Sequence, residues 1–181
     1  MKQTRHLLIA LALGTMLTSC GASVSTATVT GPAAYVDPYI GSGGHGHVFV
    51  GASVPFGAIQ AGPQNIHKGW DWCSGYHHSD SIVIGFAHTH LSGTGCTDMG
   101  DVQIMPYTGE LRSKRGRQED IGGSCSSYYS HNNESVSPGY YSLKMDNGVR
   151  IEMTASTRTA LHRITYPEAE GRRLLINLEE G

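Results

Sequence analysis

The stretch from Gly69 to Asp101 gathers the residue types of this sequence that could bind a ligand. It holds both tryptophans, four of the ten histidines and two of the four cysteines. An apolar run from Ile82 to Phe86 separates two loops rich in Gly, Ser, His and Asp. A strand with polar loops at both ends often presents a binding site on a rigid scaffold. A buried strand between ordinary turns would have the same composition.

Aromatic and planar polar side chains are concentrated in the first of these loops. They are Trp70, Asp71, Trp72, Ser74, Tyr76, His77 and Asp80. An aromatic ring offers apolar area and a polarised face, which suit the apolar face of a sugar ring. These residues could therefore form a carbohydrate site, although tryptophans of a β-protein more often lie in the core.

Two histidine pairs could bind a metal ion instead. His45 and His47, like His88 and His90, are two residues apart, so each pair lies on one side of an extended chain. However, no acidic residue follows His90 until Asp98, and no CxxC pair supports a structural zinc site. No serine lies in a Gly-x-Ser-x-Gly elbow. Histidines that form hydrogen bonds in polar loops are the simpler interpretation, and a histidine–metal enzyme is a third hypothesis.

Short apolar runs separated by turns must position these loops. We expect strands over 48–54 with a bulge at Gly51, and over 58–61, 82–86, 102–106, 140–145, 149–156, 160–166 and 173–178. A polar excursion covers 108–129, and Asp146-Asn147-Gly148 predicts a type I′ hairpin turn. The sequence has 24 glycines and no convincing amphipathic helix. This pattern predicts an all-β fold, either a sandwich or a barrel.

The N-terminus is typical of an exported lipoprotein. Residues 1–19 have a positive start and a short apolar run, as in a signal peptide, and end before Cys20 in a sequence that resembles the bacterial lipobox. We expect Cys20 to carry a lipid that anchors the protein to a membrane, in the periplasm or at the outer membrane and cell surface. Residues 20–34 read as a flexible tether, and 35–181 as the folded domain.

Composition and the remaining cysteines limit the other classes. The net charge of −2 gives no basic surface for nucleic acid, so we expect no nucleic-acid partner. Cys73, Cys96 and Cys125 are left in an exported chain, where disulfides can form. Cys73 and Cys96 could pair across the apolar run, and the sequence leaves that pairing open.

Several long strings resemble the N-terminal domain of glycoside hydrolase family ninety-two. They are Tyr35–Gly41 (YVDPYIG), Gly43–His47 (GGHGH), Pro55–Gly57 (PFG), Gly69–His77 (GWDWCSGYH), Gly85–Gly95 (GFAHTHLSGTG), Met105–Pro106 and Leu161–Arg163. The resemblance runs from about Tyr35 to the end of the chain.

That resemblance implies a calcium-dependent, inverting exo-α-mannosidase of a bacterial glycan-degrading system. An antiparallel N-terminal β-sandwich packs on a C-terminal helical barrel that is absent from this sequence, and α-mannoside glycans bind between them. By motif position Trp70 contacts the substrate, with Trp72 ranked second. Asp71, His77, His88 and His90 are the other substrate-binding candidates.

The same resemblance assigns no catalytic residue and no metal ligand to this chain. An inverting glycosidase needs a carboxylic acid and a carboxylate on either side of the scissile bond. The resemblance implies that this pair and the calcium ligands belong to the C-terminal domain. We expect a carbohydrate-binding domain, cut short at its C-terminus and inactive by itself. A stand-alone glycan-binding lipoprotein is the alternative.

Overall fold

The computed structural model describes residues 29–96, 99–114, 116, 124–168 and 170–178. Its strands are β1 (Ala52–Ser53), β2 (Gln60–Gln64), β3 (Ile82–Val83), β4 (Gly85–Ala87), β5 (Gln103–Tyr107), β6 (Ser127–Tyr128), β7 (Glu134–Ser137), β8 (Tyr140–Lys144), β9 (Arg150–Ala155), β10 (Ala160–Thr165) and β11 (Arg173–Asn177). The 3-10 turns are η2 (Gly31–Tyr35), η3 (Trp70–Trp72) and η5 (His131–Asn133). These ranges contain no α-helix, and hence no apolar helix of membrane-spanning length. The predicted signal peptide and Cys20 lie outside them.

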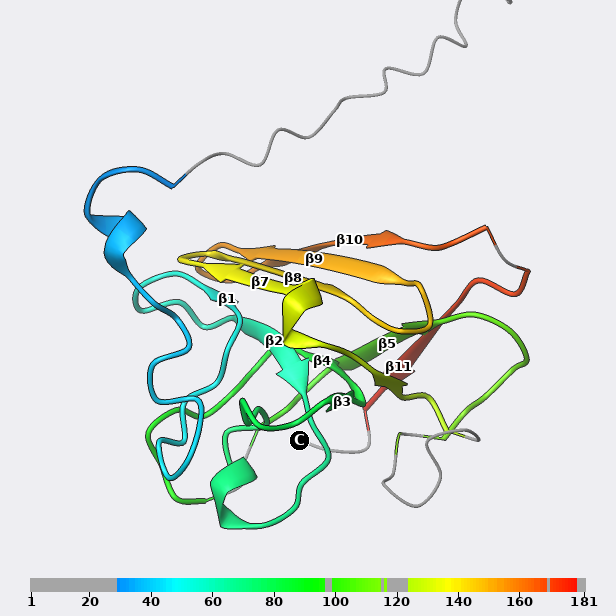
Figure 1. The fold of residues 1–181 in the computed structure, drawn as a ribbon, viewed down its shortest axis with the longest axis horizontal. Helices are drawn as coiled ribbons and strands as arrows, with labels where there is room; N and C mark the ends of the chain where they lie inside the picture. Colours follow the sequence, from blue (N-terminus) through cyan, green and yellow to red (C-terminus); the bar gives the residue numbers. More distant parts are fainter. Residues whose placement is uncertain (1–28, 97–98, 115, 117–123, 169, 179–181) are drawn as a thin grey trace, which may run out of the picture.

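Two antiparallel sheets form the layers of a sandwich (Figure 1). One sheet has the strand order β1-β2-β4-β5-β11, and the other has the order β10-β9-β8-β7. A further two-stranded sheet pairs β3 with β6. Every strand pairing in the two layers is antiparallel. The expected all-β antiparallel sandwich is therefore confirmed.

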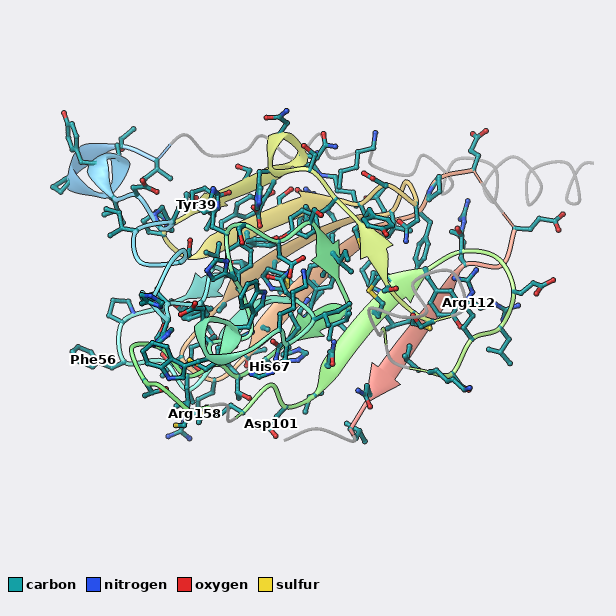
Figure 2. The ribbon with its side chains drawn as sticks, turned by 60° about the horizontal axis from the view of Figure 1, so that its bottom comes forward. Tyr39, Phe56, His67, Asp101, Arg112 and Arg158 are labelled. Atoms are coloured by element: carbon teal, nitrogen blue, oxygen red, sulfur yellow. The ribbon has the colours of Figure 1, made fainter. Side chains whose placement is uncertain are left out.

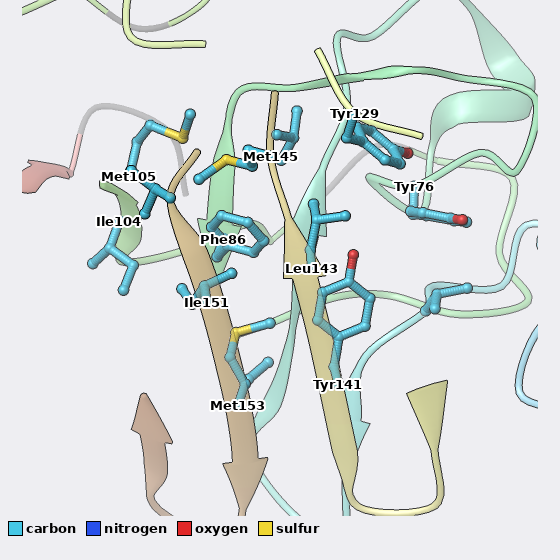
Figure 3. Close-up of a cluster of buried hydrophobic side chains, with 14 of the residues drawn as sticks. Tyr76, Phe86, Ile104, Met105, Tyr129, Tyr141, Leu143, Met145, Ile151 and Met153 are labelled. Atoms are coloured by element: carbon cyan, nitrogen blue, oxygen red, sulfur yellow. The ribbon is translucent and has the colours of Figure 1, made fainter. Parts of the chain in front are cut away.

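The core lies between the two sheets (Figure 3). Phe86 on β4 and Met105 on β5 pack from one sheet, against Tyr141 on β8 and Ile151 on β9 from the other. The rings of Phe86 and Tyr141 are 6.5 Å apart between centroids. Burial of such large apolar side chains is the main source of stability, at about 1.5–3 kcal/mol for each.

The apolar run 82–86 is not one strand, as the sequence predicts, but two. Ile82 and Val83 pair with β6, whereas β4 begins at Gly85 and pairs with β2 and β5. A Cβ at Gly85 would come within 2.2 Å of the Gln103 side chain, so only glycine fits where the chain passes from one sheet to the other. An unbroken run of buried residues hides this switch because both pieces are buried.

The β8–β9 hairpin forms where predicted, but its turn type is different. Lys144 pairs with Arg150, and the Gly148 N–H donates to the Met145 carbonyl at 2.9 Å. Only Gly148 has a positive φ, of 84°, whereas type I′ requires positive φ at two consecutive residues. The predicted type I′ turn is therefore wrong. The Met145 N–H donates to the Val149 carbonyl at 2.9 Å, so three residues form the loop between them, as in a type I turn followed by a glycine bulge.

Other boundaries also differ from the prediction. The strand expected over 48–54 is reduced to β1, and the one expected over 58–61 is shifted to β2. The sequence-based prediction missed β6, inside the polar excursion, and β7 after it. Part of that excursion, 117–123, lies outside the described residues.

Candidate functional site

Trp70 forms an ordered aromatic platform at the surface. It opens the 3-10 turn η3, in which the Cys73 N–H donates to the Trp70 carbonyl at 3.1 Å. Trp70 is 58% exposed, yet its Nε1–H donates to the Gly95 carbonyl at 2.9 Å. The edge of the His47 ring meets it at 4.2 Å between centroids, at an angle of 80°. An exposed tryptophan held on two sides in this way is preorganised for an apolar ligand surface.

Asp71 lies next to this platform, between two histidines of the preceding glycine-rich loop. His45 Nδ1 is 2.5 Å from Asp71 Oδ1, and this hydrogen bond holds the pKa of the carboxyl below its usual value. His47 Nε2 lies 3.5 Å from the same oxygen, which is too far for a well-formed hydrogen bond. His45 and His47 thus join the Gly41–His47 loop to η3.

Trp72 is packed more tightly than Trp70. Its Nε1–H donates to Asp80 Oδ2 at 2.9 Å, and Lys68 Nζ lies 2.9 Å from the same oxygen. The His77 ring stacks on it, 4.3 Å away at 24°. His77 Nε2 in turn lies 3.2 Å from the Gly44 carbonyl. These contacts suit Trp72 and His77 to holding the loops in place.

Asp80 organises the turn that leads into β3. Its Oδ1 accepts hydrogen bonds from the backbone N–H groups of Ser81 and Ile82 at 2.8 and 3.2 Å. With Oδ2 bound by Trp72 and Lys68, both oxygens of the side chain have partners. This is the loop-orienting role that short carboxylates commonly have in turns.

The His88 side chain connects the two sheets. Its Nδ1–H donates to the Val102 carbonyl at 2.5 Å, which leaves Nε2 as the acceptor. His162 Nε2 on β10 lies 2.9 Å from His88 Nε2 and can donate to it. Burial lowers the pKa of His162 to about 4, and the nearby His88 acts in the same direction.

His90 is buried, with 5% of its surface exposed. Its Nδ1–H donates to the Gln60 carbonyl at 2.8 Å, and its ring stacks with Phe49 at 5.1 Å and 12°. Burial lowers the pKa of His90 to about 4, so the ring is neutral at neutral pH. In this position His90 holds the segment that follows β4 against Gln60 of β2, from the inside of the protein.

The three described cysteines are free thiols, so the pairing of Cys73 with Cys96 left open by the sequence is not formed in the structure. Cys73 is buried, and its thiol donates to the Thr94 carbonyl at 3.1 Å. Burial is the main reason that its pKa is raised. The contact ties η3 to the segment that carries Gly95, the partner of Trp70.

The structure thus brings some of the sequence-predicted residues together and separates others. Trp70 and Asp71 form one surface group, and Trp72 and His77 stack beside each other in the same loop region. His88 and His90 contact other parts of the sandwich. Sequence reasoning did not find Gly95 as the support of Trp70. The His45-x-His47 spacing marked those residues, but for metal binding and not for contact with Asp71.

Comparison with known proteins agrees with this architecture. Residues 35–181 match the family model described as the glycosyl hydrolase family 92 N-terminal domain. The chain is 31% identical over 142 residues to a protein of Arthroderma benhamiae called an uncharacterized secreted glycosidase, covering 74% of this chain and 17% of that protein.

Solved structures of the same family share the fold. A GH92 α-mannosidase from Bacteroides thetaiotaomicron, solved alone and with mannoimidazole, is 40% identical and has a TM-score of 0.78 over 82% of this chain. The GH92 glycosyl hydrolase ccman5 is 28% identical over 81% of this chain, with a TM-score of 0.71. A GH92 inverting mannosidase from Bacteroides thetaiotaomicron is 26% identical over 82%, with a TM-score of 0.64.

The fold and the family match define an N-terminal β-sandwich of a glycosidase. The chain belongs to the N-terminal domain family of glycosyl hydrolase family 92, as the sequence strings predict. It spans about a fifth of the length of these relatives: 20% of each solved chain and 17% of the Arthroderma protein.

Proposed function

We propose that this chain is the mannoside-binding domain of an inverting exo-α-mannosidase. The observation that carries the proposal is the Trp70 ring, which is exposed yet fixed by Gly95 and His47. Such a ring can stack on the apolar face of a pyranose. Asp71 and His45 beside it offer an acceptor and a ring nitrogen for hydroxyl groups. The relatives named as mannosidases support mannose as the sugar.

The catalytic carboxyl groups belong, in this proposal, to a domain outside the chain. An inverting enzyme needs two carboxyl groups about 6.5–9.5 Å apart, with room for a water. Asp71, next to Trp70, is engaged by His45, and its lowered pKa makes it a poor proton donor. Glu134 and Glu152 are buried and bound by tyrosine, histidine or arginine side chains. We therefore assign binding to this chain and proton transfer to the adjoining domain.

The calcium implied by the family does not fit the donors at this surface. Calcium takes six to eight oxygen ligands, but Asp71 is faced by imidazole nitrogens. Across the described ranges, no three His, Cys, Asp or Glu side chains form a group that could hold a metal ion. We propose that calcium in the full-length enzyme is bound by residues outside this chain.

The proposal includes export and a lipid anchor at Cys20, in the periplasm or at the outer membrane and cell surface. The lipobox-like sequence before Cys20 and a relative described as secreted support it. Mass spectrometry of the bacterial product tests it. A lipid-modified Cys20 at the mature N-terminus is expected, and an unmodified Cys20 would remove the anchor.

Turnover of an aryl α-mannoside tests the division of labour. We expect none from the purified chain. We expect turnover from a chimera in which residues 35–181 replace the matching segment of the 40% identical Bacteroides thetaiotaomicron α-mannosidase. Activity of the chain alone, or a folded but inactive chimera, would contradict the proposal.

The second candidate is a stand-alone glycan-binding lipoprotein. The Trp70 platform favours it too, because it is complete within this chain. Titration of the purified chain with mannobiose separates the two. Tight binding by a monomer supports the stand-alone protein, whereas binding that requires the chimera supports the enzyme domain.

A further inference from the structure

A rigid turn displays Phe56 at the margin of the molecule (Figure 2). The Gly57 N–H donates to the Val54 carbonyl at 3.0 Å and closes a four-residue turn. Pro55 fixes the first central φ, and Phe56 follows with φ of 58°. The Ala58 N–H donates to the Thr157 carbonyl at 2.7 Å, which fastens the turn to the β9–β10 loop.

Phe56 is an unfavourable residue for this turn. A type II turn needs a positive φ at its third position, where glycine or asparagine is preferred. A bulky side chain with such a φ is an outlier that carries strain. Phe56 is fully exposed, so contacts within the described chain do not offset that strain. Strained residues persist where they serve a clamp or a binding site.

The family 92 relatives are much longer than this chain. The chain spans about a fifth of its family 92 relatives, so a protein of that length has further domains. Exposed aromatic anchors are enriched among the residues that dominate protein interfaces, with charged groups around their rim. Arg158 is exposed on the same loop that anchors the turn, and Figure 2 shows it on the same side as Phe56.

We propose that Phe56 is a docking residue that inserts into an apolar pocket of the domain adjoining this sandwich in a full-length family 92 enzyme. Arg158 faces an acidic group at the rim of that pocket. The inference rests on the proposed function, because it needs an adjoining domain. It goes further by naming a contact that is separate from the Trp70 platform and holds the two domains together.

The variant Phe56→Asn tests the proposal because asparagine tolerates the left-handed φ and removes only the ring. In the isolated chain, we expect the folding equilibrium constant to stay the same or to rise on the order of fivefold as strain is relieved. In the chimera, we expect a lower thermal midpoint and faster proteolysis between the domains. Phe56→Gly should have the same effects as Phe56→Asn in the isolated chain and in the chimera. Leu111→Asn, which removes another exposed apolar side chain (76%), should change neither protein.

Four results would overturn the proposal. A destabilised isolated chain would mean that the ring supports its own domain. An unchanged midpoint and proteolysis rate in the chimera would exclude docking. An unchanged midpoint with a raised KM for the mannoside would place Phe56 against sugar. Loss of a dimer of the isolated chain in sedimentation would place it against a second copy. A folded but inactive chimera counts against the proposed function, and its thermal midpoint still reports on docking.

Discussion

The support of Trp70 by Gly95 can be tested without altering the tryptophan. In Gly95→Ala the new Cβ would lie 2.8 Å from Trp70 Nε1 and 3.3 Å from Cε2 and Cζ2. Non-bonded carbon and nitrogen atoms settle near about 3.5 Å, so the indole has to move by about 0.7 Å. Gly95 has no positive φ, so the alanine backbone itself is unstrained.

The displacement should weaken substrate use roughly tenfold or more. The hydrogen bond from Trp70 Nε1 to Gly95 is stretched, at a cost of about 1 kcal/mol. A shift of about 1 Å in a positioning group can lower the rate by about 100-fold. The assay is kcat/KM of the chimera for an aryl α-mannoside, with the mannobiose affinity of the chimera as a second measurement.

A second glycine provides the matched control. In Gly43→Ala the Cβ would meet the His78 Cβ at 3.7 Å, an ordinary contact, so activity should be unchanged. Unchanged kinetics in Gly95→Ala, or an equal loss in Gly43→Ala, would refute the role assigned to the fixed position of the indole.

Three further predictions concern the scaffold and the Asp71 contact. The pKa of His90 falls from 6.5 in the unfolded chain to about 4 in the folded protein, which corresponds to about 3 kcal/mol. The unfolding free energy should therefore fall as pH drops from about 6.5 to 4, because only the unfolded ring gains a proton in that range. Urea unfolding at both pH values should show a smaller dependence of the unfolding free energy on pH in His90→Asn, and an unchanged dependence would contradict the assignment. Phe86→Ala should cost about 3–5 kcal/mol in the same assay because Phe86 is 0% exposed, whereas Tyr35→Ala, at a side chain 91% exposed, should stay within about 0.5 kcal/mol. Carboxyl NMR should show the lowered pKa of Asp71 rising toward its ordinary 3.8 in His45→Gln, because the His45 hydrogen bond is the main cause of the shift; the contact should persist at neutral pH and be lost only in acid below that ordinary value.

The sequence predicts strands best where one face is apolar. Alternation on β9 places Ile151 and Met153 in the core, with Glu152 between them on the other face and paired with Arg163. β7 was missed because Glu134–Ser137 has little apolar character. Its stability depends on partners far away in the sequence.

The buried Glu134 illustrates those distant partners. Its carboxylate accepts hydrogen bonds from Tyr76 and Tyr141 at 3.0 and 2.6 Å and contacts His131 at 2.7 Å. A buried carboxylate is tolerated only when bound in this way. No local sequence pattern predicts this group of hydrogen-bonded side chains, because its members come from η5, two strands and a loop.

The candidate site, too, could be predicted from the sequence only in part. The string from Gly69 to His77 was enough to name Trp70 and Asp71 as candidates, through residue types and order alone. The supports of that surface, His45, His47 and Gly95, come from two other loops and became visible only in three dimensions. Conversely, the neighbouring positions of His88 and His90 suggested one site, whereas the structure gives them separate partners in the sandwich.

The central claim is that the Trp70 ring binds mannoside for an enzyme completed by another domain. The most direct measurement is kcat/KM of the chimera with Trp70→Ala, beside Tyr128→Ala, which removes another exposed aromatic ring (49% exposed) on β6. The account predicts a loss of roughly 100-fold, about 2.7 kcal/mol of transition-state stabilisation, for Trp70→Ala and none for Tyr128→Ala. Normal kinetics in Trp70→Ala would contradict it.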